Sequence, residues 1–96
     1  MIGILIFPDF QLLDASGPAT VFEIAKRFAP HASDVKMIAI QAGAVRSSCG
    51  VEVLASGLRS ANSLTTLVVA GGLGVDAVLE SRPTLTFVRR LARSGA

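Results

Sequence analysis

The sequence is poor in the residues that usually build metal, redox and nucleic-acid sites. Its 96 residues include one cysteine, Cys49, and one histidine, His31, so neither an internal disulfide nor a metal site with the usual ligand spacing is expected. Tryptophan and tyrosine are absent, and the five phenylalanines give no stacking platform for single-stranded nucleic acid. We therefore expect no metal and no other cofactor.

Long hydrophobic runs are also missing. The apolar N-terminal segment has no basic leader and is interrupted by Pro8 and Asp9, and no run approaches the ~20 residues of a membrane span. Hydrophobic residues make up 51% of the chain and charged residues 17%, which is enough to bury a core. The net charge of +2 comes from scattered basic residues. These features predict a cytoplasmic globular protein without membrane contact.

Strand-like and helix-like segments alternate along the chain. Residues 2–7 are a continuous aliphatic run, typical of a strand buried on both faces of a parallel sheet. Ser16 is placed to cap the following helix, with Pro18 in its first turn and an apolar stripe that includes Val21 and Phe28. The other expected elements are a strand over 35–40, short strands over 44–47 and 51–54 that can pair as an antiparallel arm, a strand over 64–70, a short helix over 75–80 and a last helix from Pro83 to Ser94.

This order predicts an open α/β fold with a mostly parallel sheet and right-handed crossovers. Ligands of such sheets bind beyond the carboxyl ends of the strands. The next element would be another strand, and the sequence stops where that strand would begin. We therefore expect residues 1–96 to be a truncated part of a larger domain.

Asp14 follows the first strand, so its carboxylate is expected at the ligand-binding edge of the sheet. One role for it is to take or give a proton there; the other is to bond backbone amides of the next turn and complement the helix dipole. Position alone does not separate the two. The neighbouring Leu12 and Leu13 suggest partial burial, which would raise its pKa and favour the proton-handling role if no hydrogen-bond donors compensate.

Gly71 and Gly72 end the strand expected over 64–70. They allow either a close approach of backbone amides to a ligand or oxyanion, or a tight turn with positive φ. Gly72, Gly74 and Ala77 also satisfy a G-x-G-x-x-A spacing, but the turn follows a late strand and no Asp or Glu appears about 20 residues on to hold a ribose. A dinucleotide site is therefore rejected.

Three other features favour structural interpretations. No helix follows Cys49, as a nucleophile elbow would require, so a structural or incidental role is expected for it. His31 has no partner nearby in the sequence. Arg89, Arg90 and Arg93 could bind phosphate, but a solvated helix face explains them better.

Several short motifs together resemble the DJ-1/PfpI superfamily over essentially the whole chain, with the class I glutamine amidotransferase-like sensor domains of AraC/GlxA-type regulators as the nearest pattern. They are residues 4–14 (ILIFPDFQLLD), 17–18 (GP), 21–23 (VFE), 45–48 (VRSS) and 70–72 (AGG). The resemblance implies a flavodoxin-like, Rossmann-like three-layer sandwich, of which residues 1–96 are the N-terminal half. It also implies that Asp14 faces a nucleophile, usually cysteine, located beyond this chain, and that Gly71 and Gly72 belong to the ligand pocket through the backbone amide of Gly72.

The resemblance implies a function in transcription regulation. In the regulator branch this domain binds a small-molecule effector, and DNA is bound by a C-terminal helix-turn-helix domain that this chain lacks. We expect a homodimer. The alternative is a cysteine-dependent enzyme similar to isocyanide hydratase, in which Asp14 assists the missing thiolate. A third hypothesis is an inactive α/β piece with poor solubility.

Overall fold

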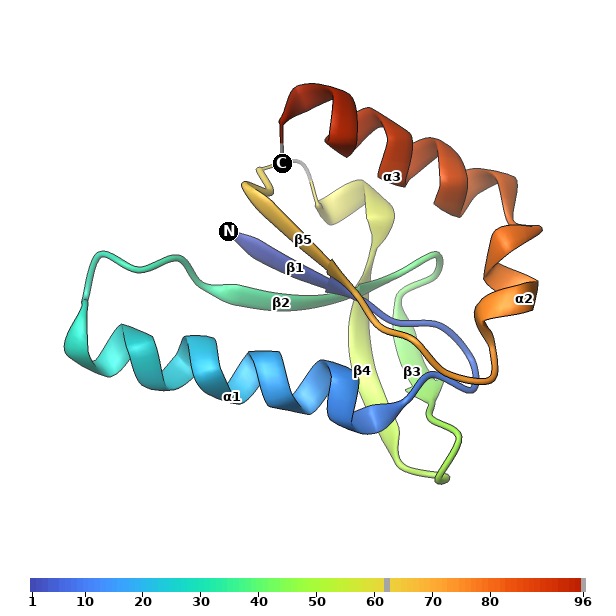
Figure 1. The fold of residues 1–96 in the computed structure, drawn as a ribbon, viewed down its shortest axis with the longest axis horizontal. Helices are drawn as coiled ribbons and strands as arrows, with labels where there is room; N and C mark the ends of the chain where they lie inside the picture. The colour runs from blue at the N-terminus through green and yellow to red at the C-terminus, as the bar shows by residue number, and fades with distance from the viewer. Residues whose placement is uncertain (62, 96) are drawn as a thin grey trace.

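The computed structural model of the protein describes residues 1–61 and 63–95, which form a sheet with helices on both faces (Figure 1). The elements, in chain order, are β1 (Ile2–Leu5), α1 (Leu12–Phe28), β2 (Val35–Ala39), β3 (Gly43–Arg46), β4 (Glu52–Gly57), the short 3₁₀ helix η1 (Leu58–Ser60), β5 (Thr66–Val69), α2 (Val75–Leu79) and α3 (Arg82–Ser94). The predicted mixed α/β class is confirmed. No helix in the described part of the chain is long and apolar enough to cross a bilayer.

The five strands lie in the order β3-β4-β2-β1-β5. Strand β1 pairs in parallel with β2 and β5, so that Ile2 faces Val35 on one side and Thr66 on the other. Side chains from Ile4 to Phe7 are buried, as expected for an aliphatic run in the middle of a parallel sheet. The carboxyl ends of β1, β2 and β5 therefore meet at one edge of the sheet.

The predicted antiparallel arm is confirmed, and its second strand does more than pair with the first. β3 and β4 are antiparallel, with Val45 opposite Val53. The far end of β4 then pairs in parallel with β2 through Ser56 and Gly57. The arm is thus an extension of the main sheet rather than a separate unit.

The residues of β1 alternate between two hydrophobic clusters, one on each face of the sheet. Ile4 belongs to the cluster that contains Ala15 of α1, whereas Leu5 belongs to the cluster that contains Phe87 and Leu91 of α3. The two helices therefore cover opposite faces, as Figure 1 shows.

Helix α1 begins earlier than predicted. Its N-cap is Gln11 rather than Ser16, and Pro18 lies inside the helix rather than in its first turn. The helix tolerates the missing proline N–H because packing of Ala15 against the sheet holds this segment. The apolar stripe predicted for this helix is mostly not buried, since Val21, Ile24 and Phe28 are 63%, 42% and 84% exposed.

Helix α3 has clear signals at both ends. The Ser81 hydroxyl caps the helix by accepting from the Thr84 N–H at 3.5 Å, and Pro83 falls within the first turn. Gly95 ends it in the left-handed conformation, with φ of 87°. The helix starts at Arg82, one residue before the predicted Pro83.

Candidate functional site

Three loops converge at the carboxyl ends of β1 and β5. Phe10, which is fully buried, forms isolated bridges both to Ser47 in the β3–β4 turn and to Gly72 in the loop after β5. Backbone bonds join the loops: the Asp9 N–H donates to the Arg46 carbonyl at 2.9 Å, and the Gln11 N–H donates to the Gly71 carbonyl at 2.8 Å. The edge where ligands of parallel sheets bind is therefore a fixed backbone framework.

Asp14 lies in the first turn of α1 and contacts the predicted glycine loop. Its Oδ2 accepts a hydrogen bond from the Gly71 N–H at 2.9 Å. A Cβ atom on Gly71 would lie 3.0 Å from the same oxygen, so a glycine favours this close approach. The structure thus brings Asp14 and Gly71, which are 57 positions apart in sequence, into direct contact.

The expected partial burial of Asp14 is wrong. The side chain is exposed, and Leu13 beside it is 70% exposed. Because the helix already begins at Leu12, Asp14 lies on a helical turn whose buried side is taken by Ala15. The carboxylate is accordingly open to solvent and to ligands, and its bond to Gly71 is the backbone-bonding role that its position also allowed.

Gly72 differs from Gly71 in both conformation and hydrogen bonding. Its φ is 125°, and a Cβ would come within 2.6 Å of the Gln11 nitrogen. The Gly71 N–H is engaged by Asp14, whereas the Gly72 N–H donates to no protein group within residues 1–61 and 63–95. Gly72 and Asp14 are both exposed residues, and the ligand roles of Asp14, Gly71 and Gly72 stay predictions.

Gly74 completes the close packing of this loop. A Cβ there would lie 2.0 Å from the Pro8 carbonyl oxygen, and the Gly74 N–H donates to the Asp9 carbonyl at 3.2 Å. The G-x-G spacing that resembled a dinucleotide motif is therefore explained by loop-to-loop packing. The spacing alone did not indicate which loop it packs against.

Ser47 belongs to the VRSS motif at 45–48, but the sequence assigned it no role of its own. Its side chain is only 1% exposed, and its Oγ lies 3.2 Å from the Sγ of Cys49. This hydrogen bond, together with one from the Val51 backbone, lowers the pKa of the exposed Cys49 thiol below its ordinary value. Cys49 is thus a solvent-accessible thiol rather than a small hydrophobe within the core.

A hollow of about 570 Å³ opens beside this framework, at the carboxyl ends of β1 and β2. Its lining includes Ile6, Pro8, Ala39, Val45 and Arg46, so it is mainly apolar with one cation. Asp14 and the two glycines do not line it. His31 is exposed in the α1–β2 loop, and no group of three or more potential metal ligands occurs among the residues that the structure describes.

Several known proteins are similar to this chain. No protein-family model matches the chain. An uncharacterised protein from the cpoL 5′ region of Streptomyces lividans is 41% identical over 70 residues, which is 72% of this chain and 49% of that protein. Among solved structures, DJ-1beta of Drosophila melanogaster superposes with a TM-score of 0.82 at 21% identity, covering 99% of this chain and 50% of that one.

The chain has the DJ-1 superfamily fold. The predicted flavodoxin-like architecture is therefore confirmed, and the chain spans about half the length of the relatives that it matches. An AraC family transcriptional regulator from Pseudomonas putida shares the fold with a TM-score of 0.62 at 20% identity. That match covers 75% of this chain and 40% of the regulator.

Proposed function

We propose that this DJ-1-fold chain is the N-terminal half of the effector-sensing domain of an AraC-type transcription regulator. The observation that carries the proposal is the fold match to an AraC family regulator, together with the sequence motifs that resemble this branch. In the proposal a small-molecule effector binds in the cytoplasm, and a helix-turn-helix domain outside this chain binds DNA. The assembled regulator is a homodimer whose DNA-binding state the effector biases.

The proposed effector site is the sheet edge where Asp14 meets the glycine loop. An anionic carboxylate and a neighbouring amide donor at Gly72 can together bind a ligand that carries both a hydrogen-bond donor and an acceptor. The three loops that Phe10 joins through its bridges to Ser47 and Gly72 form a three-loop framework. This framework positions the carboxylate and the amide before the ligand arrives, which reduces the entropy cost of binding. The nearby apolar hollow would accept the ligand body.

The test is the substitution Asp14→Asn in the natural protein that contains this sequence. A thermal-shift screen of nitrogen-containing metabolites should first find a compound that raises the melting temperature saturably. Asp14→Asn should then weaken its affinity by roughly tenfold, because a charge-assisted hydrogen bond becomes a neutral one. Glu80→Gln removes the same charge outside the loops and should leave the affinity unchanged. An unaltered affinity in Asp14→Asn would remove Asp14 from the effector site.

The second candidate is a cysteine-dependent DJ-1/PfpI enzyme of the isocyanide-hydratase type. The free Gly72 amide next to the Asp14 carboxylate favours it, since such a pair could bind an oxyanion and handle a proton. The two candidate functions differ in the complex that the protein forms with its ligand. The sensor binds its effector reversibly, whereas the enzyme forms a covalent thiol adduct that mass spectrometry of the natural protein with an electrophilic substrate would detect.

A further inference from the structure

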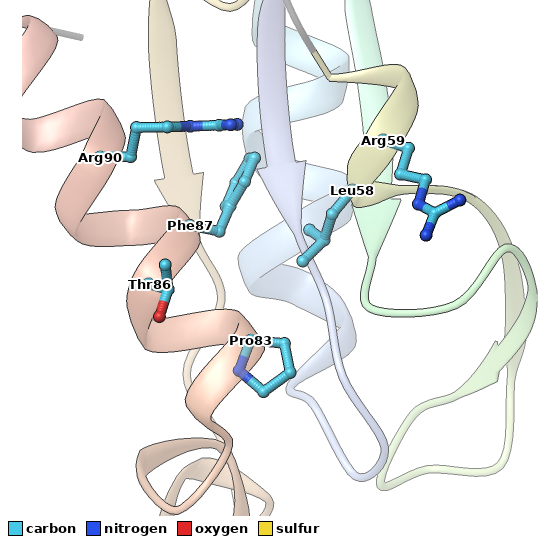
Figure 2. A pocket seen from close by; sticks show the side chains of 6 residues that line it. All are labelled: Leu58, Arg59, Pro83, Thr86, Phe87 and Arg90. Atoms are coloured by element: carbon cyan, nitrogen blue, oxygen red, sulfur yellow. The ribbon is translucent and has the colours of Figure 1, made fainter.

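A second pocket lies on the α3 face of the sheet, away from the Asp14 site. It has a volume of about 320 Å³ and opens between η1 and α3 (Figure 2). None of its residues belongs to the three-loop framework. They are Leu58, Arg59, Pro83, Thr86, Phe87 and Arg90.

The apolar part of the pocket is firmly held. Phe87 is 5% exposed and shares a cluster with Leu5 of β1 and Ile38 of β2. Figure 2 shows Leu58 projecting from η1 toward the side where Phe87 and Pro83 of α3 lie. β1 and β2 are each paired with strands on both sides. The apolar wall of the pocket therefore packs against the central strands of the sheet.

The pocket is positively charged without compensation. The Arg90 guanidinium carbon lies 5.6 Å from the centre of the Phe87 ring, a cation–π arrangement that holds the arginine at the pocket wall. Arg59 lines the η1 side. Neither arginine forms an ion pair with a carboxylate of the described chain. α3 itself contains four arginines and no acidic residue, and a neighbouring hollow is lined by Arg89, Arg90 and Arg93.

We propose that the pocket between η1 and α3 binds a small organic carboxylate with an apolar body. The carboxylate accepts hydrogen bonds from Arg90, with Arg59 adding favourable charge, and the body lies against Leu58 and Phe87. The pocket volume is at the lower end of the range for small-molecule sites, which suits a ligand the size of one ring with a short acid chain. This site is separate from the proposed effector site.

The probe is 4-phenylbutyrate, titrated into the ¹⁵N-labelled 96-residue chain after a dispersed amide spectrum has shown that the chain is folded. We expect saturable shifts at Leu58, Thr86 and Phe87. Its uncharged analogue, 4-phenylbutanol, should bind at least fivefold more weakly, and inorganic phosphate should not saturate the same shifts. Equal binding of the alcohol, or the same saturable response to phosphate alone, would overturn the proposal.

Matched variants locate the interaction. Arg90→Gln should weaken phenylbutyrate binding at least fivefold, whereas Arg82→Gln, the same change on the same helix outside the pocket, should stay within twofold. Arg90→Lys keeps the charge and should give an intermediate loss, which covers the case in which Arg90→Gln fails to fold. Equal effects of Arg82→Gln and Arg90→Gln would show general charge attraction and contradict the site. Asp14→Asn should not alter this binding, so failure of one proposal is distinguishable from failure of the other.

Discussion

Two glycines with nearly the same φ allow steric packing to be separated from backbone conformation. Gly43 has φ of 127° and nothing within 4 Å of the position that a Cβ would take, whereas Gly72 has φ of 125° and the Gln11 nitrogen at 2.6 Å from that position. Gly72 is therefore constrained twice, once by its dihedral angle and once by the loop against which it packs. Gly43 is constrained by its dihedral angle alone.

We predict that Gly43→Ala lowers the free energy of unfolding by about 1 to 3 kcal/mol, the cost of a non-glycine residue in an unfavourable backbone region. Gly72→Ala should cost about 1 to 3 kcal/mol more, because its methyl group must push the Gln11 backbone aside. Urea unfolding of both variants at matched m-values measures the difference. Equal losses would mean that the glycine loop separates from residues 8–11 without cost.

The site residues show where sequence reasoning succeeds and where it stops. The glycine turn after a strand and an acidic residue after β1 were recognisable because strand ends in a parallel sheet share an edge. The exposure of Asp14 was mispredicted because hydrophobic neighbours in sequence, such as Leu13, can lie on the outer side of a helix. Ser47 lay within a recognised motif, but its burial could not be predicted, since it depends on the bridge to Phe10.

At the scale of elements, helix α1 has an exposed apolar stripe. Leu13, Val21, Ile24 and Phe28 are 70%, 63%, 42% and 84% exposed, and their spacing places them along one side of the helix. The side of the helix that packs against the sheet buries little apolar surface, since Ala15 is its fully buried residue. A stripe of this kind favours association with another apolar surface.

We predict that the chain self-associates through this stripe and that Val21→Lys with Phe28→Lys reduces the association. Sedimentation velocity across a concentration series measures it. The double change should alter the free energy of unfolding by no more than about 0.5 kcal/mol per site, because both side chains are exposed. Leu79→Lys, at a 59% exposed position on α2, serves as the matched control. Undiminished association in the double variant would place the contact on another surface.

The helix boundaries illustrate a second limit of the sequence. Ser81 and Gly95 marked α3 well, because side-chain capping and a left-handed glycine are local chemistry. Ser16 and Pro18 led to a wrong start for α1, because these local signals favour a later first residue than the tertiary packing allows. The Asp14 N–H donates to the Gln11 carbonyl at 3.0 Å and closes the first turn. No side chain caps this turn, so the sequence contains no signal for it.

For the whole molecule, the sequence predicted the class of sheet but not its order. Continuous aliphatic strands indicated a parallel sheet, and both β1–β2 and β1–β5 pairings are parallel. The central position of β1 and the double role of β4 depend on long-range pairing, which leaves no local pattern in the sequence. The chain spans about half the length of the relatives that it matches, and the assignment of residues 1–96 to half of a domain stays a prediction.

The sheet order also predicts how stability is distributed. β1 and β2 are flanked by strands on both sides, whereas β5 pairs with β1 alone and β3 pairs with β4 alone. Edge strands open more readily, because fewer hydrogen bonds and contacts must break for their amides to reach water. The five strands should therefore exchange amide hydrogens at different rates.

We predict that native-state hydrogen exchange of the 96-residue chain ranks β1 as the most protected strand, with β2 next and with β3 and β5 well behind. Two-dimensional NMR after transfer to deuterated buffer resolves the strands separately. The β1 amides should exchange only through global unfolding, whereas the β5 amides should exchange through smaller openings that respond weakly to denaturant. If β5 were as protected as β1 and its protection rose with protein concentration, a second copy would be covering the edge. Protection of β5 that did not depend on concentration would instead contradict its assignment as an open edge.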